Sequence, residues 1–443
     1  AYRAGQLLHA AGIPRGALQF LPGSGETVGA KLVADRRVRG VIFTGSTEVA
    51  HIINRTLAKR CVDESCDIPF IAETGGQNAM IVDSSALPEQ VVQDVITSAF
   101  DSAGQRCSAL RVLCLQTDIA DKTLHMLQGA MQELRVGNPD RLATDIGPVI
   151  DSEAQRNLLA HIDRIKANAK GFYQLPLDAV TQHGTFVAPT VLEIRSLSEL
   201  QREVFGPVLH VIRYTRDELP QLIDAINASG YGLTLGIHSR IDETIDFITT
   251  HAHVGNIYVN RNIVGAVVGV QPFGGEGKSG TGPKAGGPLY LKRLQRNPTV
   301  KLNAHTIHGV STSADTSLLE VLLAWARTHG HERIAALGEQ YAHATMVNTA
   351  LVLPGPTGER NTMSFAPRGP VLCAAAGVSA LLNQLAAVFA TGNTAYVRAS
   401  AADLIPSGLP HRVRDAIRVV DQTQLANVDL HLALVETSQT HTL

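Results

Sequence analysis

Short apolar stretches alternate with helix-length amphipathic stretches along most of this 443-residue chain, and this alternation is the strongest constraint on its fold. Strands separated by helices at this spacing are typical of βαβ units, which build parallel sheets. The expected strands are 17–21, 40–43, 69–72, 79–82, 111–115, 210–214 and 256–259, and the expected helices are 1–11, 26–34, 47–59, 88–100, 156–169, 218–228, 317–328 and 331–343. The helix at 156–169 is expected to bury one face, formed by Leu158, Leu159, Ile162 and Ile165. The pattern therefore predicts an α/β protein.

Length and composition narrow the class of protein further. At ~150 residues per domain, the length predicts two or three domains with hydrophobic cores of their own. Lys and Arg number 38 against 40 for Asp and Glu, which argues against a nucleic-acid-binding surface. No apolar run reaches the ~20 residues of a membrane-spanning helix. The five cysteines form no CxxC pair and the 17 histidines show no metal-ligand spacing, so we expect no disulfide framework, no metal and a reducing, cytoplasmic compartment.

Cys107 and Glu73 are the first candidates for chemistry. Cys107 lies in the polar loop GQRCSA beside Arg106, whose charge favours the thiolate that a nucleophile requires. Glu73 ends an apolar strand, at the edge where α/β sheets bind ligands, and partial burial would raise its pKa toward that of a general base. Each residue also has a plainer interpretation, namely a buried structural cysteine and a surface carboxylate in an ion pair.

Three further segments have features of a binding site. In FTGSTEV, Gly45 and Ser46 lead into a helix whose N-terminus can bind a phosphate or can simply be capped. In EVFGPVL, Glu203 can accept hydrogen bonds from a sugar and Phe205 can pack on a flat ring, although a strand edge beside a core aromatic residue explains the same pattern. The glycines of 265–282 either let backbone N–H groups approach a ligand or make a flexible loop.

Together these motifs resemble those of the aldehyde dehydrogenase superfamily. FTGSTEV, ETGGQNA, GQRCSA, EVFGPVL and QPFGG occur in the order and at the spacing of that family, over about residues 1–300. The segment 264–294 looks like the branch that oxidises L-glutamate γ-semialdehyde, the open form of Δ1-pyrroline-5-carboxylate. The residues after 300, above all LPGPTGERN, are similar to the C-terminal part of bifunctional proline utilization A proteins, in which a proline dehydrogenase module precedes the aldehyde dehydrogenase.

The resemblance implies an NAD-dependent oxidoreductase of proline catabolism, with FAD confined to a fused proline dehydrogenase module. Cys107 would attack the aldehyde, the thiohemiacetal would lose hydride to NAD, and Glu73 would activate the water that hydrolyses the thioester to L-glutamate. The cofactor residues that it implies are Gly45, Ser46, Thr74, Gly75, Glu203 and Phe205. The substrate residues that it implies are Arg106, Ser108, Gly265, Ala266 and Phe273, of which the donors hold the α-carboxylate and the aromatic ring packs on the aliphatic stem.

The resemblance also implies a domain organisation: a partial Rossmann-type nucleotide domain, an α/β catalytic domain and a dehydrogenase-like α/β domain at the C-terminus. The expected boundaries are 1–77 for the C-terminal half of the NAD-binding domain, 78–262 for the catalytic domain, 263–300 for the Gly-rich substrate loop and return segment, 301–315 for a linker, and 316–443 for a noncatalytic C-terminal domain. In the last of these, 366–400 resembles the opening strand–helix–strand of a nucleotide domain. The implied partners are the small-molecule substrate and the fused module, a homo-oligomer is left open, and nucleic acid is not expected.

The chain opens on Ala1, inside an expected helix and without an initiator Met, so we expect a piece of a longer protein. In the family, an Asn that stabilises the oxyanion and a Lys that binds the adenosine ribose would both precede Ala1. Loss of one oxyanion donor typically costs ~10²–10³ in turnover. Two alternatives therefore stay open: a noncatalytic scaffold or oligomerisation fragment of such an enzyme, and, with less support, a cysteine hydrolase that pairs Cys107 with a histidine.

Overall fold

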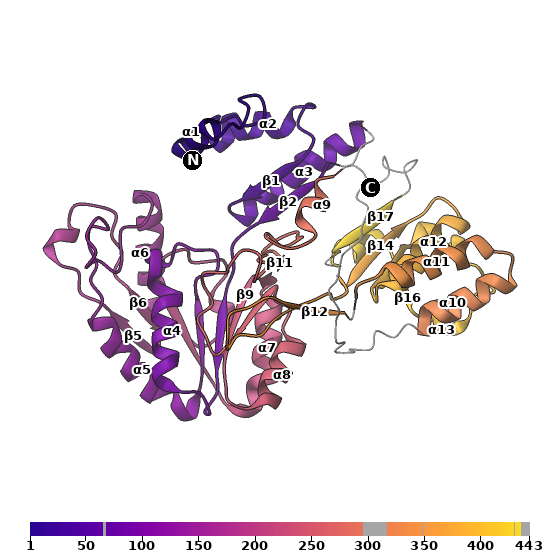
Figure 1. Ribbon diagram of the computed structural model, residues 1–443. Helices are drawn as coiled ribbons and strands as arrows, with labels where there is room; N and C mark the ends of the chain where they lie inside the picture. Colours follow the sequence, from indigo (N-terminus) through magenta and orange to yellow (C-terminus); the bar gives the residue numbers. More distant parts are fainter. Residues whose placement is uncertain (65–67, 296–316, 348, 429, 436–443) are drawn as a thin grey trace. The chain divides into compact units, whose positions relative to one another are not determined.

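The computed structural model describes the chain except residues 65–67, 296–316, 348, 429 and 436–443 and the side chains of 62–64 (Figure 1). The chain forms two compact units, Ala1–Ala72 and Glu73–Leu443. Within the described ranges, none of the helices combines the length and the apolar character that a membrane span requires. The linker expected at 301–315 lies outside the described residues.

The first unit is built from short elements around a two-stranded sheet. The elements are α1 (Tyr2–Ala10), a π-helical turn (Gly25–Gly29), α2 (Ala30–Ala34), β1 (Val41–Thr44), α3 (Thr47–Glu64) and β2 (Phe70–Glu73), whose last residue opens the second unit. The helices expected at 1–11, 26–34 and 47–59 are confirmed. The strand expected at 17–21 is wrong: this segment has no regular structure, because a strand exists only where a neighbour completes its hydrogen-bond ladder.

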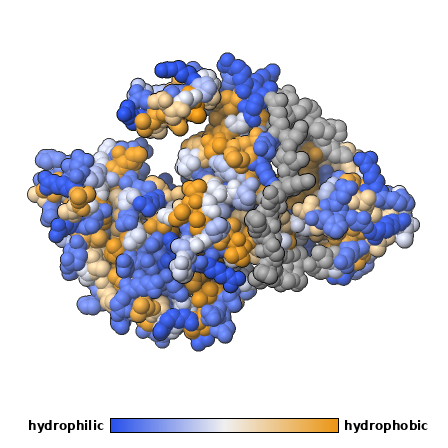
Figure 2. All heavy atoms as spheres, in the orientation of Figure 1, coloured by the Kyte–Doolittle hydropathy of each residue, from blue (hydrophilic) through white to orange (hydrophobic). Residues whose placement is uncertain are grey.

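Many large apolar side chains of this first unit are exposed. They include Tyr2, Leu7, Leu8, Phe20, Leu21, Ile42 and Ile52. Figure 2 shows the mixed character of the molecular surface, with hydrophobic residues interspersed among hydrophilic ones. Apolar exposure on this scale is typical of surfaces that contact other protein segments.

A seven-stranded sheet organises the first part of the second unit (Figure 1). Its order is β10 (Asn256–Val259), β9 (Thr234–His238), β3 (Ala79–Val82), β4 (Val112–Gln116), β7 (Val208–Tyr214), β6 (Thr190–Glu193) and β5 (Gly171–Gln174). All neighbouring strands are parallel except the pair at the β5 edge. The central strands β3, β4 and β9 are buried along their whole length, which explains why they are continuous apolar runs in the sequence.

Helices cover this sheet and complete its core. They are α4 (Pro88–Phe100), α5 (Thr117–Gln132), α6 (Ser152–Lys166), α7 (Leu219–Ala228) and α8 (Asp242–His251). Helices α4 and α5 pack against each other and against β7. On α6, Leu158, Ile162 and Ile165 are buried as expected, but Leu159 is 43% exposed, so its placement on the buried face was wrong. Leu159 lies ~100° around the helix from Leu158, outside the i, i+4, i+7 stripe that faces the sheet.

A separate hydrophobic core supports the C-terminal part of the second unit. It surrounds a parallel sheet of order β16 (Ile417–Val420), β15 (Thr394–Arg398), β14 (Pro370–Ala374) and β17 (Leu432–Val435). The helices are α10 (Ser317–Thr328), α11 (Glu332–Ala344), α12 (Val378–Ala390), α13 (His411–Asp415) and α14 (Gln422–Leu425). Besides short 3₁₀ turns, the other elements are β8 (Tyr231–Gly232) with β11 (Glu276–Gly277), α9 (Tyr290–Arg293), and the hairpin of β12 (Ala350–Leu353) and β13 (Asn361–Ser364). The strand–helix–strand expected within 366–400 is confirmed as β14, α12 and β15.

Candidate active site

The amino ends of three neighbouring strands bring the candidate residues of the second unit together. Glu73 lies before β3, Cys107 before β4 and Glu203 before β7. Because β3, β4 and β7 are adjacent and parallel, their amino ends meet at one edge of the sheet. Most α/β sheets bind ligands at the opposite, carboxyl edge. Glu73 reaches the amino edge of this sheet as the last residue of β2, which belongs to a different sheet.

The loop that carries Cys107 begins with an unusual backbone. After α4, the short turn Asp101–Gly104 holds Ser102, Ala103 and Gly104 at φ 55°, 54° and 64°, in the left-handed region that side chains disfavour. A Cβ at Gly104 would lie 2.2 Å from the carbonyl oxygen of Gly206, so only glycine fits there. Left-handed conformations at residues other than glycine persist where the surroundings determine them, and they cluster at functional sites.

Asn78 fixes the other end of this loop. Its side chain is 2% exposed, and its Nδ2 donates to the carbonyl oxygens of Cys107 at 2.7 Å and Ala109 at 2.8 Å. Its Oδ1 accepts from the backbone N–H of Thr234 at 3.1 Å. A single buried amide therefore connects the loop of Cys107 to β3 and β9.

The thiol of Cys107 differs from the other described cysteines of the second unit. Cys114 and Cys373 are buried members of the two cores, whereas Cys107 is half-buried and belongs to neither. Burial raises the pKa of Cys107, the carboxylates of Glu203 and Glu73 raise it further, and backbone N–H groups partly oppose them. Both carboxylates thus act on the same sulfur.

Arg106 does not have the effect on the thiol that its position in the sequence suggests. The expectation was that its charge lowers the pKa of Cys107, but that pKa is raised. The side chain of Arg106 is exposed, and its Nε donates to Ser102 Oγ at 3.1 Å. Arg106 is the neighbour of Cys107 in the chain, but its charge does not dominate the pKa of the thiol, because water screens a guanidinium at the surface.

Glu73 has the environment of a general base. Burial raises its pKa to about 7, while the backbone N–H of Gly275, 3.3 Å from Oε2, and the charge of Lys284 limit the shift. Its Oε1 is buried and accepts no hydrogen bond from any described residue. Lys284 Nζ donates to the carbonyl of Gly274 at 2.9 Å, and burial lowers its pKa to about 8.

Glu203, Phe205 and Gly75 form the side of the site expected to hold a cofactor. Glu203 accepts from Arg111 Nη2 at 3.1 Å, and a Cβ on Gly75 would lie 1.8 Å from Glu203 Oε2. Phe205 is 43% exposed, with the Arg111 guanidinium 5.1 Å from its ring centroid. Thr74 Oγ1 donates to the carbonyl oxygen of Lys278 at 2.5 Å, which anchors the start of this segment.

Gly45 and Ser46 belong to the first unit, separate from the unit that holds Cys107. Ser46 Oγ accepts from the backbone N–H of Val49 at 3.3 Å, so it caps the N-terminus of α3. A Cβ on Gly45 would lie 2.5 Å from the Phe43 ring. The capping interpretation describes Ser46 in this structure, and its contact with a cofactor stays a prediction.

The expected substrate residues lie on two segments of the second unit. Ser108 is buried directly after Cys107. In the Gly-rich segment, Gly265 has φ +78°, and the backbone N–H groups of Gly265 and Ala266 donate to no described residue. Phe273 is half-buried, and its backbone pairs with Ala285. The roles of these residues in substrate binding stay predictions.

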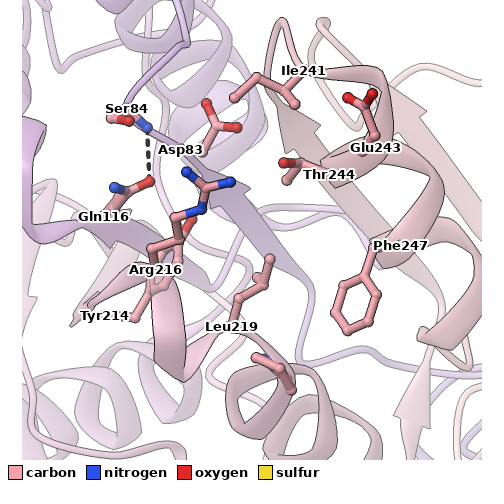
Figure 3. A pocket seen from close by; sticks show the side chains of 11 residues that line it. Asp83, Ser84, Gln116, Tyr214, Arg216, Leu219, Ile241, Glu243, Thr244 and Phe247 are labelled. Carbon is pink, nitrogen blue, oxygen red and sulfur yellow. Dashed lines mark hydrogen bonds between the residues drawn. The ribbon is translucent and has the colours of Figure 1, made fainter.

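A cavity of about 360 Å³ lies away from this site (Figure 3). Residues at the carboxyl ends of the strands line it: Asp83 and Ser84 follow β3, and Gln116 ends β4. Its polar groups bond within the protein: the Ser84 N–H donates to Gln116 Oε1 at 3.0 Å, and Asp83 accepts from Ser85 and Ser239. The cavity is therefore distinct from the site around Cys107, which lies at the amino ends of the same strands.

Three residues that shape the site were not predicted from the sequence: Asn78, Arg111 and Lys284. Asn78 carried a signal, because a polar amide directly precedes an apolar strand and lies five residues after Glu73. Arg111 carried a similar sequence signal, because it is a charged residue at the start of an apolar, buried strand. Lys284 has no comparable signal within its Gly-rich segment. In the described part of the chain, no group of three or more His, Cys, Asp and Glu side chains is arranged to hold a metal ion.

The fold and this site define the class of protein. The aldehyde dehydrogenase family matches residues 1–300, and the chain belongs to that family. The chain is 58% identical over 401 residues to the bifunctional protein PutA of Escherichia coli, an alignment that covers 87% of the chain and 30% of PutA. It is 37% identical over 293 residues to the 1-pyrroline-5-carboxylate dehydrogenase of Geobacillus thermodenitrificans, covering 66% of the chain and 56% of that enzyme.

Solved structures give the same assignment. A crystal structure of bifunctional proline utilization A matches with a TM-score of 0.63 and 55% identity, over 66% of this chain and 29% of that one. The 1-pyrroline-5-carboxylate dehydrogenase from Thermus with bound NAD matches with a TM-score of 0.61 and 38% identity, over 66% and 56%. The chain thus spans less than a third of the PutA proteins and just over half of the single-function dehydrogenases.

Proposed function

We propose that the chain contributes the nucleophile and the general base of an NAD-dependent dehydrogenase that oxidises L-glutamate γ-semialdehyde to L-glutamate in proline catabolism. The observation that carries this proposal is the half-buried thiol of Cys107, on which the carboxylates of Glu73 and Glu203 both act. The relatives named 1-pyrroline-5-carboxylate dehydrogenase support the substrate, because that compound is the closed form of the semialdehyde. The Thermus relative with bound NAD supports the cofactor.

The chemistry begins when Cys107 Sγ bonds to the aldehyde carbon and forms a thiohemiacetal. NAD, when bound, supplies the acceptor for the hydride that leaves this carbon, and a thioester results. Glu73 then takes a proton from the water that attacks the thioester, and Cys107 leaves as the thiolate while L-glutamate is released. A pKa of about 7 suits Glu73 to this step, because a base works best when its pKa lies near the working pH.

The residues present fit both ligands. For NAD, the fixed carboxylate of Glu203 beside the exposed ring of Phe205 suits a ribose attached to a flat ring, with Thr74 and Gly75 in the same unit. Gly45 and Ser46 are proposed for the phosphates on the family resemblance alone. For the substrate, the N–H groups of Gly265 and Ala266, which donate to no described residue, suit the α-carboxylate, together with Ser108 and Arg106, and Phe273 suits the aliphatic stem.

The test measures NADH formation from Δ1-pyrroline-5-carboxylate. Since the chain spans 30% of the Escherichia coli relative, it is assayed alone and joined to the preceding part of that protein. In the form that turns over, Cys107→Ala is expected to abolish NADH formation, whereas the matched change Cys61→Ala in the first unit is not. Turnover that survives Cys107→Ala would refute the nucleophile assignment.

Other outcomes favour the alternatives. A folded chain that produces no NADH in either form supports a noncatalytic scaffold fragment. Ester hydrolysis without NAD that is lost on changing a histidine supports a cysteine hydrolase. The domain boundaries, the fused proline dehydrogenase module and a cytoplasmic location belong to the same proposal, and the bifunctional relatives support the fused module.

A further inference from the structure

Arg111 lies between the two segments that form the candidate site. Its side chain is 1% exposed, and it directly precedes β4. Toward the nucleophile loop, Nη1 donates to the carbonyl oxygen of Gly104 at 2.6 Å and Nη2 to that of Arg106 at 3.0 Å. One guanidinium group therefore holds the loop on the N-terminal side of Cys107.

The same guanidinium holds the segment that precedes β7. Nη2 donates to Glu203 Oε1 at 3.1 Å, and Nη1 lies 3.4 Å from the carbonyl oxygen of Gly206. The ring of Phe205 lies beneath the guanidinium carbon at 5.1 Å. Loop and segment are thus connected through a planar group whose donors have fixed directions, which an ammonium group cannot reproduce.

Stability alone is a weak reason for this arrangement. Removing a guanidinium and a carboxylate from water costs several kcal/mol per ion, on the order of what their attraction returns. Burial lowers the pKa of Arg111, Glu203 opposes that shift, and its Nε is buried and donates to no described residue. A pair of apolar side chains in place of Arg111 and Glu203 would avoid these costs, so the pair calls for a role beyond stability.

The charges around the thiol suggest that role. Glu203, Glu73, Tyr258 and Arg111 interact electrostatically with Cys107. Glu203 and Glu73 are the carboxylates of this group, Tyr258 is uncharged at neutral pH because burial raises its pKa to about 12, and Arg111 is the cation. Glu203 is the stronger of the two carboxylates in opposing the thiolate, and it is the one that Arg111 pairs with.

We propose that Arg111 is a positioning residue that holds the Cys107 loop and the Glu203–Phe205 segment in one geometry and offsets the charge of Glu203 at the thiol. The proposal rests on the proposed function only in taking Cys107 as the nucleophile. Without Arg111, the carboxylate of Glu203 would disfavour the thiolate more strongly, and the segment expected to hold the cofactor would lose the contacts that Arg111 makes with it.

The test measures the rate at which iodoacetamide alkylates Cys107 in this chain as a function of pH, identified by mass spectrometry of the peptide. The test requires neither NAD nor turnover. The role of Arg111 can therefore be refuted while the proposed function stands, and the proposed function can be refuted while the role of Arg111 stands. Arg111→Met is expected to slow alkylation at neutral pH by about tenfold, which corresponds to one pKa unit of the thiol. Adding Glu203→Gln to Arg111→Met is expected to restore most of the rate.

The matched control is Arg213→Met. Arg213 also pairs with carboxylates, of Glu193 and Asp121, but it lies on the outer part of β7 with 29% of its side chain exposed. We expect no change in the alkylation rate for this variant.

Two results would overturn the proposal. The first is a wild-type alkylation rate in Arg111→Met. The second is an alkylation rate in the double variant with Glu203→Gln that is as slow as in Arg111→Met alone, because this would indicate that the loop is disordered. If Arg111→Met does not fold, the alkylation rate of Cys107 in the Glu203→Gln single variant tests the proposal. Removing this carboxylate is expected to speed alkylation at a given pH, and an unchanged or slower rate contradicts the role assigned to the pair.

Discussion

At Glu73, the burial that suits the residue to catalysis also costs stability. Its pKa rises from an ordinary 4.5 to about 7, because the carboxylate loses hydration when its side chain is buried. The folded state therefore binds this proton more tightly than the unfolded state. The stabilisation from Glu73 is fully present below about pH 4.5 and is lost as the pH rises through about 7.

The first prediction concerns Glu73→Gln, which removes the charge and keeps the shape. Above pH 7 we expect this variant to be more stable than the wild type by up to ~3 kcal/mol, with little difference below pH 4.5. In the form that turns over, it should lose the general-base step. Urea unfolding at both pH values tests the stability, and the exposed Glu89→Gln serves as control. Equal differences at the two pH values would contradict the prediction.

The second prediction concerns Gly75, where close approach requires the absence of a Cβ. Gly75→Ala places a methyl group 1.8 Å from Glu203 Oε2, so the carboxylate must move. We expect NAD binding to weaken by about tenfold or more, because displacing the Glu203 carboxylate would lose one hydrogen bond to the cofactor. Titration of NAD measures this, in the form of the protein that binds it.

Gly129→Ala is the matched control for Gly75→Ala. Gly129 lies within α5 with open space around it, so alanine should stabilise the helix by about 1 kcal/mol and leave NAD binding unchanged. Unchanged NAD affinity in Gly75→Ala would argue against a cofactor role for this edge of the site.

At the scale of the elements, the connection from α4 to β4 adopts a backbone conformation that requires support from neighbouring residues. It contains the left-handed residues Ser102 and Ala103, and each such conformation costs about 1–3 kcal/mol. Asn78 and Arg111 supply the contacts that offset this cost, from opposite sides of the loop. Cys107 is therefore presented by a strained loop at the edge of the sheet.

The third prediction tests the contribution of Asn78. Asn78→Ala removes three hydrogen bonds and leaves two carbonyl oxygens and the N–H of Thr234 buried without this partner. We expect a loss of about 2–4 kcal/mol in the free energy of unfolding and faster proteolysis of the 101–110 loop. Asn168→Ala, at an exposed turn, should stay within ~0.5 kcal/mol of the wild type. A similar loss in both variants would contradict the special role of Asn78.

At the scale of the whole molecule, two hydrophobic cores are built from separate, consecutive stretches of the sequence. One fills the seven-stranded sheet and its helices, and the other fills the sheet of β14 to β17. Separate cores can unfold separately, so damage to one need not reach the other.

The fourth prediction follows from this separation. Leu382 is fully buried in α12, and Leu382→Ala should destabilise the C-terminal core by about 2–5 kcal/mol while Cys107 is alkylated at the wild-type rate. Hydrogen exchange resolved by segment measures the first effect. Leu432→Ala, 44% exposed on β17, should change neither quantity much. Slower alkylation in Leu382→Ala would show that the two cores are coupled.

Much of this architecture could be predicted because local patterns dictate it. The α4, α10 and β10 segments lie at the residues that periodicity indicated, since an amphipathic face or an apolar run is a property of neighbouring residues. The strand expected at 17–21 failed because pairing depends on a partner elsewhere. In the site, Cys107, Glu73 and Glu203 were recognisable from motifs, whereas Arg111 and Lys284 act through contacts with distant segments.

The sequence by itself determined the α/β class, the order of the elements and the chemical identity of the thiol and the carboxylates, because these depend on residue type and short spacing. Only the tertiary structure decided that the site lies at the amino edge of the sheet, and that the pKa of Cys107 is raised although Arg106 is its neighbour in the chain. Burial and electrostatic interactions depend on which groups meet in space. The fold brings Glu203 to the sulfur from 96 residues away and leaves Arg106 in the solvent.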